Sequence, residues 1–499
     1  MKNTSKKFTL EKTEIPSDLD DSAAIKDFLA TNKGKRVVVV QGLGFVGAVM
    51  ALVCANGVSE EYAVIGVDLA DEKNFHKIKS INEGVFPLTA NDPKIAEFYN
   101  KAMSKGNLLA TYDPIAYGFA DVIIVDVNLD VEKSSSQKGA LKDFDVDLSC
   151  FKSAINTIAS NCSENVLVLV ETTVPPGTCE KVVKPILDKQ LIERGLKIDR
   201  YKLGHSYERV MPGPDYIDSI RNYPRVFSGI NEASASAVEC FLKTIINCDL
   251  ASLTQLESTT ATEMAKVLEN SYRSTNIAFA VEWSRFAEEA GVDLYAMVNA
   301  IRIRKTHSNL MFPNIGVGGY CLTKDPLLAS WARKEFFKSE GLKMSEDSVS
   351  TNDQMPIYAY QRLKSVFGEL RDLTIALLGV SYRGDVGDTR FTPVETLYKL
   401  VLTDTEKIKL HDPFVKNWEE QNIEVSNDID DVVNGNLDLI IFSTAHTQYK
   451  SDNLISKIMS LSHCKIFDSV GLLSNEQITQ LSTKHNVSVL GRGDLAENC

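Results

Sequence analysis

A cysteine stands directly behind a glycine cluster, in the segment Gly316-Val-Gly-Gly-Tyr-Cys321-Leu-Thr-Lys324-Asp325-Pro326. Glycines leave the backbone beside the sulfur open to a ligand, and the Lys324 ammonium can favour the thiolate, which is the nucleophilic form of cysteine. Asp325 can orient or deprotonate a water molecule. The pattern indicates a covalent nucleophile, and a buried structural cysteine is the alternative that this segment alone leaves open.

A cationic donor and an amide donor lie one helical turn apart in Glu263-Met-Ala-Lys266-Val-Leu-Glu-Asn270. On a helix Lys266 and Asn270 share a face, so both can point at one reacting oxygen. Together they would stabilise an alkoxide and later an oxyanion. The alternative is a solvated helix in which Glu263 pairs with Lys266, and spacing alone favours that alternative.

A third candidate, Glu171-Thr-Thr-Val-Pro-Pro-Gly-Thr178, follows an apolar strand. Paired prolines cannot donate to a strand ladder, so the strand ends there and leaves Thr172 and Thr173 at the carboxyl edge of the sheet, where ligands bind. A plain strand terminus is an equally good interpretation of this segment taken alone.

The glycine motif Gly42-Leu-Gly-Phe-Val-Gly47 stands between the strand VVVVQ and an apolar helix. Its glycines permit a tight turn, close approach of the backbone to a pyrophosphate, and packing of helix on strand. Asp68 ends the next apolar run at the distance expected of a ribose-binding acid, and it would repel a 2′-phosphate. The motif predicts an NAD site, and a turn with only a packing role is the weaker alternative.

These side chains need sheets and a helix to bring them together. Apolar runs of strand length alternate with helical stretches before residue 230 and again after 360, which is typical of parallel α/β sheets. Between them, residues 261–290 have apolar side chains at helical spacing and should form one long helix that ends near Gly291. We therefore expect a polar extension (1–34) with one short helix, an NAD-binding domain (35–230), a helical segment with the cysteine loop (231–360) and a second α/β domain (361–499).

The composition restricts the function further. A net charge of −13 argues against bulk binding to nucleic acid or to an anionic membrane. The basic, polar N-terminus is not a signal peptide and no apolar run approaches the ~20 residues that span a bilayer, so we expect a cytoplasmic protein. Nine cysteines without CxxC pairs or His–Cys clusters predict reduced, mostly buried thiols, with no disulfide framework and no metal site.

Together these segments resemble the UDP-glucose/GDP-mannose dehydrogenase family over nearly the whole chain. GLGFVG, TTVPPGT, YERVMPG, the Glu263–Asn270 helix, GVGGYCLTKDP, NDQMP and GVSYRGDVGDTRFTP occur in the family's order and spacing. The resemblance implies two Rossmann-like doubly wound α/β domains joined by a central helical segment with one long helix. It also implies a homodimer built on that segment, and a UDP-binding C-terminal domain, since no GxGxxG follows LTIALLG.

The family's activity would be NAD-dependent oxidation of the C6 alcohol of a nucleotide sugar to the uronic acid, for polysaccharide precursors. Cys321 would be the nucleophile that forms a thioester, Lys266 and Asn270 the oxyanion donors, Glu208 the base for hydrolysis, and Thr173 and Asp325 the residues that position water. The resemblance assigns the cofactor to Gly42, Gly44, Phe45, Val46, Gly47, Asp68, Thr173, Lys324 and Arg390. It assigns the sugar nucleotide to Glu208, Arg209, Val210, Lys266, Asn270, Arg304, Gly318, Gly319, Tyr382 and Arg383.

The chain departs from the family pattern at several places. A V-P-T type stretch after the third strand is replaced by Asp126-Val-Asn-Leu-Asp130, and Tyr320 precedes the cysteine where relatives often carry His or Ser. Tyr207 replaces a proline before Glu208, Asp468-Ser-Val-Gly lacks a basic residue, and spacing does not choose between Arg302 and Arg304 for the sugar contact.

The substrate has more than one interpretation. GVGG before the tyrosine and the late GRGD (491–494) are more similar to the branch that oxidises UDP-N-acetylhexosamines than to the UDP-glucose branch. Two other classes remain: a hydroxyacid dehydrogenase of the 6-phosphogluconate type, and a catalytically idle relative that binds NAD and nucleotide. Two, one or no NADH per substrate would separate the three.

Overall fold

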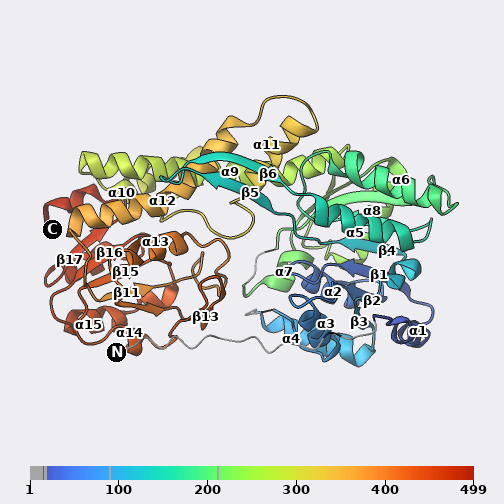
Figure 1. Cartoon of the computed structure of the whole chain (residues 1–499), viewed down its shortest axis with the longest axis horizontal. Helices are drawn as coiled ribbons and strands as arrows, with labels where there is room; N and C mark the ends of the chain where they lie inside the picture. Colours follow the sequence, from blue (N-terminus) through green and yellow to red (C-terminus); the bar gives the residue numbers. More distant parts are fainter. Residues whose placement is uncertain (1–14, 16–18, 89–91, 211–212, 499) are drawn as a thin grey trace.

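The computed structural model describes residue 15 and residues 19–88, 92–210 and 213–498, with the backbone alone for 496–498. Two sheet-containing lobes lie at opposite ends of the long axis (Figure 1). The short helix expected in the N-terminal extension is α1 (Ser22–Thr31), and residues 1–14 and 16–18 of that extension lie outside the described residues. Within the described ranges, no helix is long and apolar enough to cross a bilayer.

The first lobe contains an eight-stranded sheet in the order β10-β9-β8-β7-β4-β1-β2-β3. All neighbouring strands are parallel except β8 and β9. The β-branched run at 37–40 is buried on both faces, as expected of a strand at the centre of a parallel sheet. The strands are β1 (Arg36–Gln41), β2 (Tyr62–Val67), β3 (Leu108–Thr111), β4 (Val122–Val125), β7 (Leu167–Val170), β8 (Lys202–Tyr207), β9 (Arg225–Gly229) and β10 (Leu253–Gln255).

Helices cover both faces of this sheet. Val38 and Val40 face the core under α2, α4, α7 and α8, while Val37 and Val39 face the core under α5 and α6. The helices of this lobe are α2 (Gly47–Ala55), α3 (Phe75–Asn82), α4 (Pro93–Lys105), α5 (Ser149–Asn161), α6 (Lys184–Glu193), α7 (Tyr216–Arg221) and α8 (Glu232–Ile245).

The domain boundary that we placed at 230 is wrong, because the first sheet continues beyond it. Val238 and Leu242 of α8 are buried in the core of this lobe, and β10 pairs in parallel with β9. Residues 232–245 fall in the segment that we expected to be helical and do form a helix, but this helix covers the first sheet. The antiparallel pair β8–β9 was also not expected from the sequence.

The second lobe contains a five-stranded parallel sheet in the order β12-β11-β15-β16-β17. Its strands are β11 (Ile375–Leu378), β12 (Ile408–His411), β15 (Leu439–Phe442), β16 (Lys465–Asp468) and β17 (Asn486–Val489). Its helices are α13 (Pro393–Leu402), α14 (Ile429–Val432), α15 (Asp452–Ser460) and α16 (Asn475–Ser482), with a small hairpin of β13 (Asn417–Trp418) and β14 (Ile423–Glu424). Both sheets have the doubly wound architecture predicted from the sequence.

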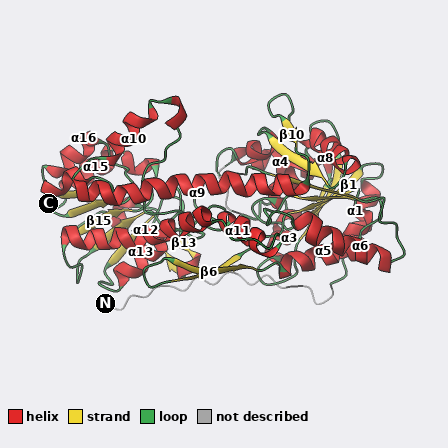
Figure 2. Ribbon diagram, turned by 90° about the horizontal axis from the view of Figure 1, so that it is seen from above, coloured by secondary structure: helices red, strands yellow, loops and turns green. Residues whose placement is uncertain are grey.

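The long helix α9 (Thr259–Ala290) runs between the two lobes (Figure 2). Its N-cap Ser258 accepts a hydrogen bond from the Ala261 backbone, and Gly291 ends it in the left-handed conformation with φ +70°, as the sequence predicted. It packs against α11 (Asp325–Glu335) and α12 (Lys343–Phe367), while α10 (Leu294–Arg302) follows it toward the second sheet. Helix α12 crosses the boundary that we had placed at 360.

An antiparallel hairpin, β5 (Val131–Ser135) and β6 (Leu141–Val146), belongs to neither sheet and crosses the top of the molecule in Figure 1. An isolated two-stranded hairpin has little stability of its own. Here its far end is held by α12, because Ser350 accepts the Leu141 N–H at 3.0 Å and Lys133 pairs with Asp353 at 2.8 Å.

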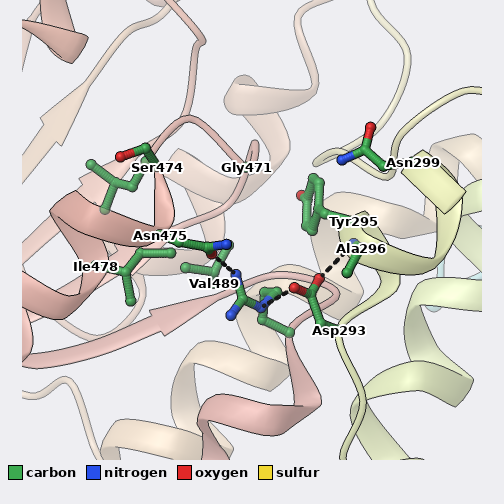
Figure 3. A pocket seen from close by; sticks show the side chains of 11 residues that line it. Asp293, Tyr295, Ala296, Asn299, Gly471, Ser474, Asn475, Ile478 and Val489 are labelled. Atoms are coloured by element: carbon green, nitrogen blue, oxygen red, sulfur yellow. Dashed lines mark hydrogen bonds and ion pairs between the residues drawn. The ribbon is translucent and has the colours of Figure 1, made fainter.

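The last strand of the second sheet is joined to α10 at a seam with a hollow of about 300 Å³ (Figure 3). Arg492 pairs with Asp293 at 3.3 Å, and it donates to Asn475 at 2.8 Å. These polar contacts fix α10, and with it the end of α9, against the second lobe.

The start of α9 is fixed to the first lobe by Glu263. Its buried carboxylate accepts the backbone N–H groups of Gly177 at 2.6 Å and Cys179 at 2.8 Å. The alternative considered for this helix, a Glu263–Lys266 pair, is therefore not formed. The hydrogen bonds to Gly177 and Cys179 hold the Thr172–Thr178 segment against α9. Burial raises the pKa of Glu263 to about 7.

We expect Glu263→Gln to lower the melting temperature, because the amide can accept from one of these N–H groups while its NH₂ faces the other. An unpaired buried donor costs about 1–3 kcal/mol. The wild-type carboxyl keeps its proton in the folded state up to about pH 7. In the unfolded state it loses the proton near its ordinary value, so this group's contribution to stability falls as pH rises between these two values.

The melting-temperature advantage of the wild type over Glu263→Gln should therefore shrink from pH 5 to pH 7.5, as measured by circular dichroism. An advantage that stays constant or grows with pH would show that Glu263 is ionised throughout this range.

Candidate active site

A cleft of about 380 Å³ lies where the carboxyl ends of the strands of the first sheet meet α9 and the second lobe. Its lining follows four neighbouring strands in turn: Gly44–Val46 after β1, Asp126–Leu129 after β4, Glu171–Thr173 after β7 and Glu208–Val210 after β8. Strand order reverses between β1 and β4, which is the point where open α/β sheets bind ligands.

The glycine turn has the geometry of a pyrophosphate cradle. Gly42 has φ +93°, and a Cβ there would lie 2.4 Å from the Asp126 carbonyl oxygen, so the turn requires glycine. A Cβ at Gly47 would meet the Gly42 oxygen, whereas a Cβ at Gly44 would have no neighbour within 4 Å. Gly44 is thus open to a ligand, and Gly47 starts α2, whose N-terminus favours an anion. These residues fit NAD.

Asp68 lies at the end of β2 but is not among the residues that line the cleft. Its carboxylate accepts the Leu43 N–H at 3.0 Å and the Leu69 N–H at 2.8 Å, and pairs with Lys77 at 3.3 Å. The contact with Leu43 fixes the glycine turn from outside. Contact of Asp68 with a ribose remains a prediction.

The second lobe contributes Tyr382, Arg383 and Arg390 from the segment after β11. The Arg390 guanidinium lies 3.7 Å from the centre of the Phe45 ring, so this lobe reaches the glycine turn directly. The tyrosine also explains two glycines, because a Cβ at Gly318 would lie 2.5 Å from Tyr382 Cβ and one at Gly319 2.8 Å from its ring.

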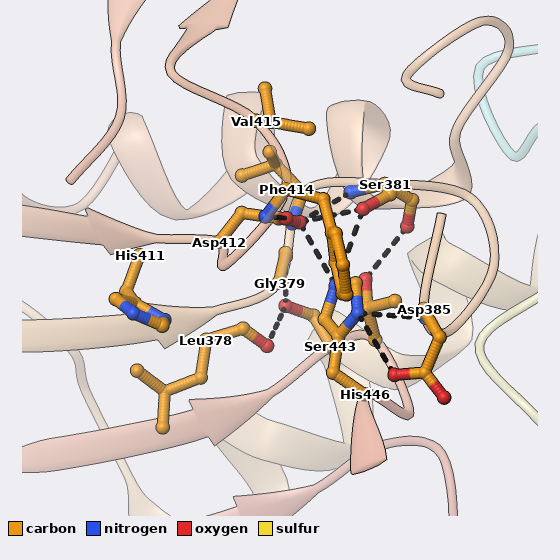
Figure 4. A network of polar contacts seen from close by, with 12 residues as sticks. Leu378, Gly379, Ser381, Asp385, His411, Asp412, Phe414, Val415, Ser443 and His446 are labelled. Carbon is orange, nitrogen blue, oxygen red and sulfur yellow. Dashed lines mark hydrogen bonds and ion pairs between the residues drawn. The ribbon is translucent and has the colours of Figure 1, made fainter. Parts of the chain in front are cut away.

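The acid at the end of β12, Asp412, is in the position that binds ribose in a dinucleotide domain, but its carboxylate is fully engaged. It accepts the Val380 and Ser381 N–H groups, the Ser381 hydroxyl at 2.6 Å and His446 Nε2 at 3.0 Å (Figure 4). The other ring nitrogen, Nδ1, accepts the Asp385 N–H at 2.9 Å. This closed network favours a smaller nucleotide over a second dinucleotide here.

Lys266 is buried where α9 meets the end of β8. Its ammonium donates to the Glu208 backbone carbonyl at 2.8 Å and lies 3.6 Å from the Glu208 carboxylate. Burial lowers the pKa of a lysine, but the carboxylates of Glu208 and Asp325 are among the groups that raise it, and the net shift is upward, so Lys266 is cationic. The Glu208 carboxylate also accepts the Val210 N–H.

Asn270 donates to the Asp325 carboxylate at 2.6 Å, and this bond joins α9 to the segment that follows the cysteine. The other Asp325 oxygen lies 3.2 Å from the Lys324 ammonium, as an ion pair without an aligned hydrogen bond. The predicted candidates Cys321, Lys266, Asn270 and Glu208 therefore line one part of the cleft together. Asp325 does not line it, because its side chain is fully buried and meets the cleft only through Asn270 and Lys324.

Cys321 lines the cleft and is exposed, although protein atoms crowd its sulfur. This crowding and the Asp325 carboxylate raise the pKa of the thiol to about 11, while Lys266 and Lys324 lower it. Lys324 does favour the thiolate, as predicted, because it lowers the pKa of the thiol. Burial and Asp325 raise that pKa more. The side chain is thus a neutral thiol at neutral pH.

Two carboxyl groups in the cleft lack full hydrogen bonding within the described residues: Asp126 Oδ2 and Glu171 Oε2. Glu171 pairs with the buried Arg225 at 2.8 Å through its other oxygen. Burial raises the pKa of Glu171 to about 7, and raises that of Asp126 well above its usual range. Both groups therefore hold their protons to a higher pH than an exposed carboxyl group does.

The outcome for the other candidates is mixed. Thr173, Arg209, Val210, Gly318, Gly319 and Lys324 line the cleft. Thr172 lines it as well, and it also ties β4 to β7 by donating to the Val125 carbonyl at 3.0 Å. Neither Arg302 nor Arg304 lines it: Arg302 donates to the Ser308 carbonyl, and Arg304 is exposed beside Lys305–His307. The assignment of Arg304 to the site of this chain is not supported.

The sequence reasoning missed Arg273, Glu269 and Tyr223, which also line the cleft. Arg273 follows Asn270 by one turn of α9, so its position was available from the same helical spacing. It makes no ion pair with any residue in the described part of the chain, whereas Arg209 pairs with Glu269 at 3.2 Å.

The cysteines differ from the prediction of mostly buried thiols. Of the eight that the structure describes, Cys54, Cys162, Cys179 and Cys464 are buried and four are exposed, and none is in a disulfide. In the same residues, no group of three or more His, Cys, Asp or Glu side chains is placed to hold a metal ion.

Comparison with known families matches most of the chain to three models of one family. These are the NAD binding domain (35–246), the central domain (260–354) and the UDP binding domain (376–475) of the UDP-glucose/GDP-mannose dehydrogenase family. The first match ends at the close of α8, in agreement with the sheet rather than with our boundary at 230.

Similar proteins cover the chain nearly end to end. The UDP-N-acetyl-D-mannosamine dehydrogenases of Pyrococcus horikoshii and Methanocaldococcus jannaschii are 30% and 29% identical over 92% of this chain, with 100% and 97% of their own lengths matched. The solved structure of the Pyrococcus horikoshii UDP-D-ManNAc dehydrogenase has a TM-score of 0.74 at 27% identity, covering 92% of this chain and 100% of that one. This chain therefore belongs to the UDP-glucose/GDP-mannose dehydrogenase family, as an NAD-dependent oxidoreductase of nucleotide sugars.

Proposed function

We propose that the cleft oxidises the C6 hydroxymethyl group of a UDP-linked hexose to a carboxylate in two hydride-removing steps, the second of which uses a thioester on Cys321. The observation that carries this proposal is that one cleft is lined by the Cys321 thiol, by Lys266 and Asn270 of α9, and by the strand ends of the NAD-binding lobe.

In the first step the alcohol loses a proton and a hydride and becomes an aldehyde. Lys266 and Asn270 face the reacting oxygen and stabilise its negative charge, each by about 3 kcal/mol, a typical value for one oxyanion donor. Glu208 holds the Lys266 ammonium through its backbone carbonyl, so the cation is in place before the charge develops.

In the second step the Cys321 thiol adds across the aldehyde C=O bond: sulfur binds carbon, and the proton ends on oxygen. The carbon of this thiohemiacetal carries a hydrogen that can leave as hydride, and loss of the hydroxyl proton as well gives the thioester. Water then attacks the carbonyl and breaks the C–S bond, which releases the acid and restores the thiol. Glu208 removes a proton from that water, and Thr173 and Asp325 position it.

NAD, when bound, accepts the hydride in each step and is replaced between them. Gly42–Gly47, Asp68, Thr173, Lys324 and Arg390 would hold it, and Tyr382 and Arg383 would hold the UDP moiety together with Gly318 and Gly319. The cationic side chains Arg209, Arg273, Arg383 and Arg390 supply positive charge for these anionic ligands in a protein with a net charge of −13.

We propose a UDP-N-acetylhexosamine as the sugar nucleotide, with UDP-glucose as the alternative. Two observations support the choice. The first is the GVGG and GRGD segments of the sequence, and the second is the activity of the relatives from Pyrococcus horikoshii and Methanocaldococcus jannaschii, which are UDP-N-acetyl-D-mannosamine dehydrogenases. The role in polysaccharide precursor synthesis and the cytoplasmic location remain predictions.

Purified protein incubated with NAD and a panel of UDP- and GDP-hexoses, N-acetylated ones included, should form two NADH per sugar consumed, with one UDP-N-acetylhexosamine preferred. Cys321→Ser should stop short of two, because serine is a much poorer nucleophile at the aldehyde. One NADH per sugar in the wild type, or two in Cys321→Ser, would contradict the thioester route. Two NADH with UDP-glucose alone would contradict the choice of sugar.

We also propose that the protein forms a homodimer through α9. Six large apolar side chains on this helix are between 42% and 64% exposed, and helical spacing places them within about 100° of one another. Apolar surface of this extent usually marks an interface. The six are Met264, Leu268, Tyr272, Phe279, Trp283 and Phe286.

Light scattering after gel filtration should give about twice the 55.2 kDa of one chain. The double variant Trp283→Glu with Phe286→Glu should shift the mass toward one chain, because two charges would be buried at the interface. Leu250→Glu is the matched control, since Leu250 is 67% exposed but lies in the first lobe, outside α9. A dimer that survives the double variant would contradict this interface.

A further inference from the structure

Two departures from the family pattern, far apart in the sequence, are in contact in the structure. The hydroxyl of Tyr320, the residue before Cys321, donates to the Leu129 carbonyl at 2.8 Å and lies 2.7 Å from the Asp130 carboxylate. Leu129 and Asp130 belong to the segment that replaces the V-P-T stretch after β4. The cysteine loop is thereby bound directly to the NAD-binding lobe.

The ring of Tyr320 is also fixed within the cysteine loop. The Lys324 ammonium lies 4.5 Å from the ring centre, and the Phe391 ring of the second lobe lies 6.0 Å away. Lys324 in turn pairs with Asp325, which accepts from Asn270 of α9. The loop around Cys321 is thus held at two points, by α9 through Asp325 and by the β4 end through Tyr320.

The acceptors of the Tyr320 hydroxyl cannot move freely. On one side of them, Val127 donates its N–H to the Thr172 hydroxyl at 2.9 Å. On the other side the chain continues directly into the β5–β6 hairpin, whose far end is bound to Ser350 and Asp353 of α12. Because the segment that carries both acceptors is held on either side, the bond to it restricts the position of Tyr320. Cys321 is the next residue, so its position is restricted as well.

We propose that Tyr320 and Asp130 form a positioning pair that sets Cys321 against the cofactor side of the cleft. The inference rests on the thioester route proposed above. In that route the first hydride leaves an alcohol without help from sulfur, and the second leaves a group bonded to Cys321. The pair should therefore matter mainly for the second hydride. Burial and the bond to Asp130 raise the pKa of Tyr320 above its usual range, so the phenol keeps its proton and acts as a donor.

The first test counts NADH and released aldehyde for Tyr320→Phe, with the wild-type enzyme and its preferred UDP-sugar. We expect the ratio of NADH to sugar to fall from two toward one and aldehyde to accumulate, because a small misplacement of a reacting group can slow a step about 100-fold. Asp130→Asn keeps an acceptor oxygen and should keep a ratio close to two. Asp130→Ala leaves only the Leu129 carbonyl as acceptor and should lower the ratio, though less than Tyr320→Phe does. An equal slowing of both hydrides would overturn the proposal in favour of a merely structural role.

Tyr360→Phe is the matched control, since Tyr360 donates to Asp404 at 2.6 Å outside the cleft. It removes the same kind of Tyr–Asp bond and should keep a ratio of two. A wild type that forms fewer than two NADH would contradict the proposed function itself, and the pair would then be judged by the second test.

The second test needs no sugar. Alkylation of Cys321 by iodoacetamide, followed by mass spectrometry of its peptide, should be several-fold faster in Tyr320→Phe than in the wild type and in Tyr360→Phe, because the freed loop exposes the sulfur. A rate in Tyr320→Phe equal to or below that of the wild type would show that the hydroxyl does not position the thiol, and would overturn the proposal whatever the substrate.

Discussion

A lysine ammonium is buried where α9 meets the end of β8, and much of the active-site geometry depends on it. Lys266 donates to the Glu208 backbone carbonyl at 2.8 Å, so one hydrogen bond joins the central helix to the first sheet. Burial alone would lower the pKa of the lysine, but the net shift is upward, because neighbouring carboxylates such as Glu208 and Asp325 raise it. The positive charge therefore persists at the place where an oxygen must become negative, beside the thiol.

The charge of the cleft also depends on the carboxyl groups near Lys266. An ammonium surrounded by ionised Asp126, Glu171, Glu208 and Asp325 would leave the cleft strongly negative and hostile to a dinucleotide and a nucleoside diphosphate. Burial raises the pKa values of Asp126 and Glu171, which opposes the build-up of this negative charge. With the arginines of both lobes at its rim, the cleft can accept anions on an acidic protein.

Much of the fold and the site could be predicted because the signals are local. The glycine motif between a strand and a helix, the end of α9 at Gly291 and the cysteine loop each lie within a short stretch of sequence. Contacts between distant segments could not be predicted: Glu263 binds Gly177 and Cys179 rather than Lys266, and Tyr320 binds Leu129 and Asp130. For the same reason the sequence could not show that α8, at the start of the expected helical segment, covers the first sheet. Spacing did not choose between Arg302 and Arg304, and both lie outside the cleft.

The central claim is that Cys321 carries the substrate as a thioester, and trapping that species tests it most directly. Glu208→Gln should slow hydrolysis while leaving the backbone carbonyl that holds Lys266 in place. After acid quench of this variant during turnover, we predict that the Cys321 peptide gains the mass of the nucleotide-sugar acid less one water. NADH formation by this variant with an unmodified Cys321 peptide, or an adduct on another residue, would contradict it.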